Sequence, residues 1–366
     1  MRAGTRITVA MSISGLLNIY KPIDWTSFDV VKKLRLMYKI KKVGHAGTLD
    51  PFAEGVLPVA FGQATKWISY IQRGSKEYIA LIYCGTATDT ADIAGREITT
   101  KKEFSPEEIA AFSRDDFATI RALLAERIGS LSQVPPMFSA RKYQGQRLYD
   151  LARRGIEVER PAKEITVEAG ELLAASFVEW SKSAVEPVPS KAAGFAHLRG
   201  IWEEYFARPL PRPISSGKYM VLLVRWLVST GTYVRVLASD LGADLGTNAY
   251  CAALLRSAYG PQHYTTASPL TALPPDVAEL TASELLLSAD AALAEIPPLY
   301  IDARELQKLY WGQSFPIDPE RLDADIAPPY RAVNQSPGAP RVTHGIVNIV
   351  YTEGRPWVKA ERMFPA

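Results

Sequence analysis

The sequence predicts an α+β fold, in which capped helices and β-rich runs form one large domain that is followed by a small β domain. Three observations support this class. Helix-start signals occur at Ser27 and Ser105, and runs rich in β-branched and aromatic residues cover 77–84 and 219–228. Beyond residue 297 the composition changes to short strands and turns. With 366 residues and 47% hydrophobic content, the chain can bury a sizeable core.

The first helix is expected to begin at Ser27, whose hydroxyl can cap the free backbone N–H groups. Its buried face would consist of Val30, Val31, Leu34, Met37 and Tyr38. A glycine-rich turn over 44–51 follows and carries Asp50 near its end. Residues 77–84 are typical of a strand, and residues 85–95 of a second loop.

A longer helix is expected from Ser105 to Gly129, because a capping serine precedes a proline and two acids, and apolar residues then recur at helical spacing. Residues 133–163 are polar, basic and interrupted by prolines and a glycine. This composition favours an extended loop arm with a short helix near Tyr149.

Residues 174–218 contain five prolines and no sustained period, which indicates an inserted surface segment. A strand over 219–228 and a helix over 233–245 come next, and a further amphipathic helix is expected over 282–294.

Prolines mark a domain boundary near 275–297. In the small domain that follows, 343–351 and 356–364 are typical of a hairpin that turns through Glu353 and Gly354. The chain has no evident internal repeat.

The net charge of +3 is small, but its distribution is uneven. Residues 21–42 carry a local charge of +5 and residues 141–163 one of +4, which leaves −6 for the rest. Such segregation suits a phosphate-binding face on an acidic body, although two solvated faces would explain it equally well.

Other function classes are disfavoured by what the sequence contains. Apolar runs such as 219–228 are much shorter than the ~20 residues that a bilayer requires. Two cysteines and four scattered histidines show no metal-ligand spacing. Together with the lack of a signal-like N-terminus, these features favour a reduced, cytoplasmic protein without a metal, and Met11 is a possible start.

Asp50 is the first candidate catalytic carboxylate, because a turn with two glycines can present its side chain to a ligand. Taken alone, an Asp–Pro pair is more often ordinary turn chemistry. Asp89 and Asp92 could join Asp50 around a divalent ion, as in a metal-dependent phosphohydrolase. We prefer the interpretation that these two aspartates brace a loop.

The residues around Asp50 carry a more specific signal. Residues 44–59, which read GHAGTLDPFAEGVLPV, closely resemble the active-site motif of bacterial tRNA pseudouridine-55 synthases, the TruB family. Four further segments match motifs of that family in the same order, namely 15–22, 76–95, 133–153 and 231–256. Five ordered matches across residues 15 to about 260 are far more specific than any one of them.

The resemblance implies an isomerase that converts the uridine at position 55, in the T loop of tRNA, to pseudouridine without a cofactor. By similarity Asp50 is the nucleophile and Arg235 is its ion-pair partner, since a guanidinium favours the ionised carboxylate. Tyr78 would stack on the uracil near C5. The catalytic set implied is therefore Asp50, Arg235 and Tyr78.

The same resemblance implies a substrate-binding set. Tyr233 and Leu254 correspond to residues that contact the uridine, Arg256 belongs to the same motif, and Lys21 would be a positive support near the cleft. His45 would fill the stack that the extruded uridine vacates. Where the family commonly has Ser-Lys-Gly, this chain has Ser-Thr-Gly at 229–231, so one basic contact is missing.

The implied architecture is a pseudouridine-synthase-like mixed sheet, mostly antiparallel and flanked by helices, followed by a PUA-like β domain. The catalytic domain would span 13–275, with an RNA-binding arm at 132–163 and the insertion at 174–218, and the PUA-like domain would span 297–366. The expected partner is the T-stem-loop of tRNA, bound by a monomer without guide RNA. The competing hypothesis is a non-catalytic tRNA-binding or tRNA-folding protein on this scaffold.

Overall fold

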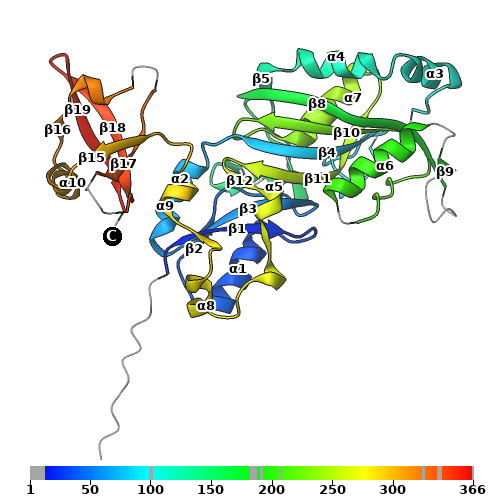
Figure 1. Cartoon of the computed structure of the whole chain (residues 1–366). Helices are drawn as coiled ribbons and strands as arrows, with labels where there is room; N and C mark the ends of the chain where they lie inside the picture. The colour runs from blue at the N-terminus through cyan, green and yellow to red at the C-terminus, as the bar shows by residue number, and fades with distance from the viewer. Residues whose placement is uncertain are drawn as a thin grey trace, which may run out of the picture.

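The computed structural model describes residues 13–98, 102–139, 141–181, 188–189, 193–206, 208–323, 326–335 and 340–364. Within them the chain forms a twelve-stranded sheet, a five-stranded sheet near the C-terminus and a two-stranded ribbon (Figure 1). This is the mixed α+β architecture with a large, mostly antiparallel sheet and a small β lobe that the sequence predicts. None of the described helices is long and apolar enough to cross a bilayer.

The main path of the large sheet runs β13-β1-β3-β11-β4-β10-β8-β5, and all of its pairs are antiparallel except β1 with β13 and β3 with β11. Its strands are β1 (Gly15–Lys21), β3 (Ala53–Phe61), β4 (Lys76–Cys84), β5 (Gly129–Gln133), β8 (Lys163–Trp180), β10 (Gly217–Val228), β11 (Ala249–Tyr259) and β13 (Ser268–Pro269). Short strands pair at its margins, namely β2 (Val43–His45), β9 (Val188–Pro189), β12 (Gln262–His263) and β14 (Leu286–Leu287).

Alternation along β4 divides the sheet into two buried faces. Tyr78, Ala80 and Ile82 belong to the core that contains α7 (Val234–Asp244). Ile79 and Leu81 belong to the core on the opposite face, which is covered by α6 (Ala193–Tyr205). The strands predicted at 77–84 and 219–228 are confirmed as β4 and β10, and the helix predicted at 233–245 as α7.

The single helix predicted from Ser105 to Gly129 is instead two helices, α3 (Pro106–Arg114) and α4 (Ala118–Glu126). Ser105 caps α3 as predicted. Asp116 and Phe117 then adopt left-handed backbone conformations, with φ of 50° and 58°. These conformations end α3 and change the direction of the chain before α4 begins. Phe117 packs on Phe177 of β8, so tertiary contact replaces helical continuity at this point.

The segment 174–218 contains more regular structure than the sequence suggests. β8 runs on to Trp180 and pairs with β10, and Trp202 of α6 and Phe206, the residue after α6, are buried in the core. After α6, the Nε of Arg208 lies 2.8 Å from Oε1 of Glu54 on β3, and its guanidinium lies over the Trp202 ring. Because Phe177, Trp180 and Trp202 are buried, the prediction of a surface segment is wrong for the described part. That the segment is an insertion stays a prediction.

The helix predicted at 282–294 is largely wrong. Leu286 and Leu287 form β14, which extends the sheet beside β1, and within that range only Ala282, the last residue of α8 (Val277–Ala282), and α9 (Ala289–Ala292) are helical. Backbone pairing with Leu16 and Leu17 therefore prevails over the helical spacing.

The C-terminal lobe is the five-stranded sheet, ordered β15-β17-β18-β19-β16. Its elements are β15 (Pro298–Ile301), α10 (Ala303–Tyr310), β16 (Phe315–Pro316), β17 (Tyr330–Asn334), β18 (Thr343–Thr352) and β19 (Arg355–Met363). The predicted hairpin is confirmed as β18 and β19, with Glu353 and Gly354 both at positive φ in its turn. The lobe contacts the large domain where the Phe364 ring packs, tilted, against the Trp67 ring. Trp67 is the last residue of η1 (Gly62–Trp67), which leads into α2 (Ile68–Ile71).

Candidate active site

The turn that carries Asp50 is fastened at several points. Arg256 of β11 donates from Nε to the carbonyl of Val56 (2.7 Å) and from its terminal nitrogens to the carbonyls of Gly47 and Thr48 (both 3.4 Å). Gly47 has a φ of +100°, and a Cβ there would lie 3.1 Å from the hydroxyl oxygen of Tyr259. A rigid turn therefore presents Asp50, and glycine is required for both backbone shape and space.

Ser27 also fastens this turn, which corrects its predicted role. Thr26, not Ser27, caps α1 (Ser27–Tyr38) through a capping box with Asp29. The Ser27 hydroxyl instead accepts from the Leu49 amide (2.8 Å) and donates to the Leu49 carbonyl (3.2 Å). The first residue of α1 thus holds the backbone next to Asp50.

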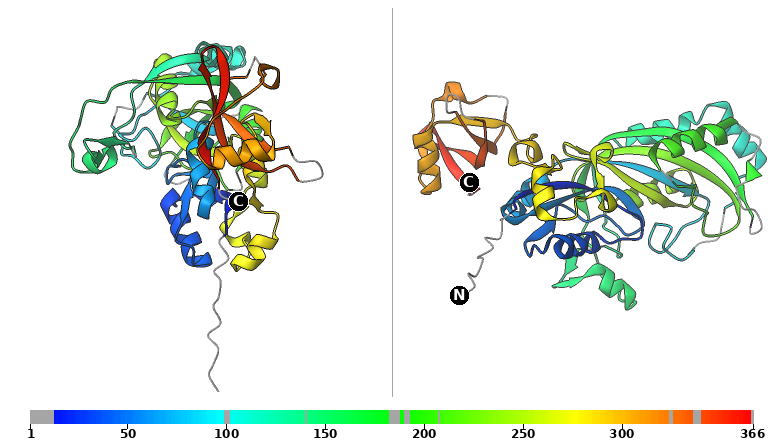
Figure 2. Two further views of the ribbon diagram at one scale, coloured as in Figure 1. Left: turned by 90° about the vertical axis from the view of Figure 1, so that its left-hand side faces the viewer. Right: turned by 60° about the horizontal axis from the view of Figure 1, so that its bottom comes forward.

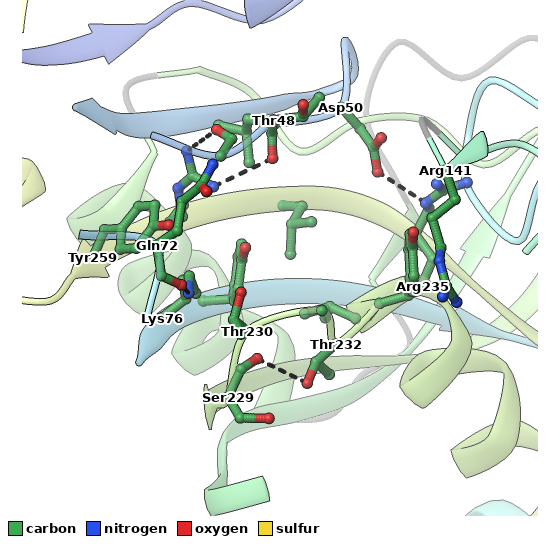
Figure 3. Close-up of a pocket in the computed structure, with 18 residues that line it drawn as sticks. Thr48, Asp50, Gln72, Lys76, Arg141, Ser229, Thr230, Thr232, Arg235 and Tyr259 are labelled. Carbon is green, nitrogen blue, oxygen red and sulfur yellow. Dashed lines mark hydrogen bonds and ion pairs between the residues drawn. The ribbon is translucent and has the colours of Figure 1, made fainter. Parts of the chain in front are cut away.

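Asp50 and Arg235 meet as predicted. Their Oδ2 and Nε atoms are 3.0 Å apart (Figure 3). The Arg235 side chain is only 3% exposed, whereas that of Asp50 is 35% exposed. The cation is therefore enclosed by protein while the carboxylate remains open to the cavity.

Arg235 makes further contacts that the sequence did not predict. Its Nη1 donates to Oδ2 of Asp92 (3.0 Å) and to the carbonyl of Thr90 (2.8 Å), and its Nη2 donates to the carbonyl of Phe138 (2.9 Å). The guanidinium therefore joins α7 to the turn of Asp50, to the loop after β4 and to the start of the arm.

Asp92 is buried and is held by several groups. Its Oδ1 accepts from the Thr90 hydroxyl (2.7 Å) and the Ala94 amide (3.0 Å). Burial raises its pKa, and the Arg235 guanidinium opposes that rise. Asp89 points elsewhere and accepts from the Arg96 amide (2.8 Å). These contacts agree with the bracing role, and the described residues contain no group of three or more His, Cys, Asp or Glu suited to a metal.

A cavity of about 460 Å³ opens beside this ion pair. Four of the predicted site residues other than Asp50 and Arg235 line it, namely Tyr78, Tyr233, Leu254 and Arg256. The other lining residues are Gly47, Thr48, Leu49, Gln72, Lys76, Arg141, Ser229, Thr230, Gly231, Thr232, Val234 and Tyr259. Figure 3 shows Asp50, Arg141 and Arg235 at one end, Gln72, Lys76 and Tyr259 at the other, and Thr230 between them. The cavity thus has the Asp50–Arg235 ion pair at one end and Lys76 at the other.

The N-terminus of α7 is tied to the last residue of β5. Gln133 accepts from the Tyr233 amide (2.8 Å) and donates to the Tyr233 carbonyl (3.1 Å). Burial raises the pKa of the Tyr233 hydroxyl, which keeps it protonated near neutral pH. The two hydrogen bonds between the Gln133 side chain and the Tyr233 backbone fix the start of the helix that supplies Arg235.

Two predicted site residues do not line the cavity. Lys21 is completely buried and donates to the carbonyls of Pro22 (2.8 Å) and Trp25 (2.6 Å) and, more weakly, to that of Pro51 (3.4 Å). Burial lowers its pKa to about 8, although the carboxylates of Glu54 and Asp50 oppose the change. It therefore supports the Asp50 turn from behind.

His45 lies in β2, opposite Val59 of β3, and its Nδ1 is buried. Burial also lowers the pKa of its imidazole, so the neutral form predominates at pH 7. His45 is two residues before Gly47, which lines the cavity, but is not itself among the lining residues.

Comparison with known proteins adds independent information. A sequence model described as the N-terminal domain of TruB family pseudouridylate synthases matches residues 35–185. The protein named tRNA pseudouridine synthase B of Dehalococcoides mccartyi strain 195 is 39% identical over 300 residues, which cover 82% of this chain and 83% of the relative. The chain belongs to the TruB family.

Other members of the TruB family match to a similar extent. The tRNA pseudouridine synthase B of Rhodospirillum rubrum is 37% identical and covers 82% of both chains, and that of Moorella thermoacetica is 37% identical and covers 79% of both. A solved structure described as a Cbf5-Nop10-Gar1 complex superposes with a TM-score of 0.60 at 20% identity, covering 96% of this chain and 85% of that one. At that identity the superposition shows the shared fold alone.

Within this TruB-family site, sequence reasoning missed the residues that position Arg235. The sequence predicts Asp92 only as a loop brace or, in the alternative, as a metal ligand with Asp50, and it predicts Gln133 only as part of the RNA-binding arm. No prediction covers the Phe138 carbonyl. Asp92 was the one carrying a signal, since a carboxylate in a Thr-Asp-Thr-Ala-Asp loop can pair with a motif arginine.

Proposed function

We propose that this chain isomerises the uridine at position 55, in the T loop of tRNA, to pseudouridine, with Asp50 as the nucleophile. Membership of the TruB family makes it a pseudouridine synthase, and relatives named tRNA pseudouridine synthase B support tRNA as its substrate. The position of the uridine and the role of Asp50 are the proposed parts.

The observation that carries the proposal is an open carboxylate paired with an enclosed guanidinium. Isomerisation breaks the N1–C1′ bond, turns the base and forms a C5–C1′ bond, so the reaction needs a carboxylate that can attack carbon or stabilise a glycosyl intermediate. Asp50 faces the cavity with 35% of its side chain exposed, and Arg235 compensates its charge from the protein side.

The remaining cavity walls suit a uracil. Tyr78 and Leu254 offer an aromatic and an aliphatic surface next to Asp50, and Tyr233 adds a second aromatic ring with a protonated hydroxyl. Stacking on such surfaces contributes ~1–3 kcal/mol per base, which offsets much of the cost of extruding a nucleotide from a loop. His45, two residues before the cavity-lining Gly47, is proposed to replace the extruded base in its stack.

The arm and the C-terminal lobe are proposed to hold the rest of the tRNA. The arm carries α5 (Leu148–Arg153) and the ribbon of β6 (Lys142–Tyr143) with β7 (Gln146–Arg147), and it protrudes from the body in both views of Figure 2. Its arginines include 141, 153, 154 and 160. We propose that the large domain spans 13–275 and the PUA-like lobe 297–366, and that one chain acts without guide RNA.

The experiment is to map pseudouridine in tRNA transcripts after incubation with the purified protein. Pseudouridine at position 55 alone is expected, and a transcript with cytidine at that position should yield none. Asp50→Asn should bind tRNA with an unchanged Kd and form no product. The matched control is Asp89→Asn, since Asp89 is an exposed carboxylate of a neighbouring loop that does not contact Arg235.

Two outcomes would contradict the proposal. Product at another uridine would refute the assigned position, and full activity in Asp50→Asn would refute the nucleophile. Tight binding by a wild-type protein that forms no pseudouridine would favour the alternative of a tRNA-folding protein.

A further inference from the structure

The basic end of the cavity lies away from the ion pair of Asp50 and has its own set of cations. Of the charged side chains that line the whole cavity, four are positive (Lys76, Arg141, Arg235 and Arg256) and only Asp50 is negative. Arg235 forms ion pairs with two carboxylates, and Arg256 donates hydrogen bonds to three backbone carbonyls. Arg141 and Arg235 lie at the Asp50 end (Figure 3), so Lys76 and Arg256, which both lie over the Tyr259 ring, supply the positive charge of the other end.

Lys76 is nearly buried, at 6% exposure, at the start of β4. Its ammonium donates to the carbonyls of Gln72 (3.0 Å) and Gly74, and it lies 4.4 Å from the ring centre of Tyr259. Burial lowers its pKa to about 8, and the charges of Arg256 and Lys163 add to that effect. Glu295 and Glu168 oppose it, but neither forms an ion pair with Lys76 among the described residues.

Lys163 brings a further cation to the same wall. It is the first residue of β8, opposite Gln133 of β5, and its side chain is exposed. A Cβ built on Gly231 would lie 2.6 Å from the Lys163 Nζ, so the ammonium lies directly against the backbone of residue 231. Within the described part of the chain no hydrogen bond or ion pair to this ammonium is found.

The wall between the two ends supplies neutral donors. Thr230 is exposed in the cavity lining, and Gly231 follows it with a φ of +88°, a conformation that leaves no side chain between Lys163 and the cavity. Thr230 and Lys76 line the same cavity, and the Lys163 ammonium lies against Gly231, the neighbour of Thr230. Hydroxyl and ammonium groups without a paired carboxylate are donors that a phosphodiester accepts from proteins.

We propose that Lys163, together with Lys76 and Thr230, binds one of the two backbone phosphates that flank the target uridine. The inference rests on the proposed function, since it requires that the uridine occupies the Asp50 end. Binding of this phosphate would hold the sugar of the target nucleotide at a fixed distance from Asp50.

The first test replaces Lys163 by Met, which keeps the aliphatic stem and removes the charge. Because one charge-assisted contact is lost, KM should rise about tenfold with kcat at saturation unchanged. The slope of log Kd against log salt concentration should decrease by about 0.7 to 0.9. Lys218→Met, at the opposite end of β10 from Ser229, is the matched control and should behave as wild type.

The second test identifies the phosphate. A T-stem-loop RNA is prepared with one neutral methylphosphonate on either side of the target uridine. Wild type should lose affinity for one of the two RNAs, and the loss for that RNA should be smaller in Lys163→Met, because one of its phosphate contacts is already absent. Additive losses at both linkages, or a Lys163→Met variant equal to Lys218→Met, would overturn the inference while pseudouridine formation by wild type upheld the proposed function. Absence of product from wild type would refute the function itself.

Discussion

Two arginine–carboxylate pairs lie at the start of β3. In one the arginine is the more buried partner, and in the other the carboxylate is. On the α7 face, Arg235 is enclosed and Asp50 is open, with exposures of 3% and 35%. On the α6 face, Glu54 is the enclosed partner at 10%, while Arg208 is 22% exposed and lies over the rings of Trp202 and Phe206. The same pair of groups can therefore serve chemistry or structure, depending on which partner faces solvent.

The buried carboxylate of Glu54 has no free side. Its Oε2 accepts from the Tyr20 hydroxyl (3.0 Å), while its Oε1 faces Arg208. Burial and the nearby Glu54 charge raise the pKa of Tyr20, so that hydroxyl stays a donor. Asp50, in contrast, is left with an oxygen for substrate. The comparison predicts that the first pair controls turnover and the second controls stability.

The largest effect is expected from Arg235→Ala. Removing the guanidinium leaves the buried Asp92 without its cationic partner and leaves Asp50 without the group that holds it in position. The value of kcat should therefore fall about 10²- to 10³-fold, with tRNA affinity largely intact. Single-turnover rates and filter binding would measure the two quantities. Wild-type turnover in this variant would remove Arg235 from the mechanism.

A smaller loss is expected from Asp92→Asn, which keeps the shape but removes one of the two charges on Arg235. Misplacement of Asp50 through a loosened arginine should lower kcat about ten- to a hundredfold and leave KM unchanged. A change confined to KM would show that Asp92 affects binding rather than the position of Asp50. Asp89→Asn again serves as the control.

For the second pair, Arg208→Met should lower the free energy of unfolding by about 1–3 kcal/mol, because a mostly buried Glu54 charge loses its partner. Urea denaturation measures this quantity, and kcat should stay within about threefold of wild type. The double variant with Glu54→Gln should recover part of the stability. A kcat loss as large as that of Asp92→Asn would contradict the structural role.

The smallest effect concerns Lys21, whose ammonium interacts with both Glu54 and Asp50. Its pKa is about 8 in the folded chain and 10.5 in the unfolded one, so between these values the unfolded chain holds more protons and stability rises with pH. The stability of wild type relative to Lys21→Met should therefore increase by about 1 kcal/mol from pH 7 to pH 9. A difference that does not vary with pH would show that Lys21 titrates normally.

The fold was predictable where local signals and burial agree. β4, β10 and the C-terminal hairpin follow from β-rich runs and turn residues, and Ser105 was correctly identified as a cap. Local signals failed where a distant segment decides the structure. Leu286 and Leu287 have helical spacing but pair with β1, and Ser27 could cap a helix but bonds to the Leu49 backbone instead.

The site was predictable to the extent that motifs specify it. Asp50, Arg235, Tyr78, Tyr233, Leu254 and Arg256 do gather around one cavity. The contacts of Asp92 and of the Phe138 carbonyl with Arg235 depend on loops that meet only in three dimensions. A backbone carbonyl carries no residue-type signal at all, so no sequence pattern could have identified the second of these contacts.

The carbonyl of Phe138 has a consequence for anyone who would re-engineer substrate choice. It belongs to residues 132–163, which we propose as the RNA-binding arm, and it accepts a hydrogen bond from Arg235. A transplant that shifts the chain by a single residue at that junction would detach the arginine, even with every catalytic side chain retained. The proposed RNA-binding arm and the proposed catalytic arginine are therefore linked through one peptide group, and an exchanged segment should begin after residue 138.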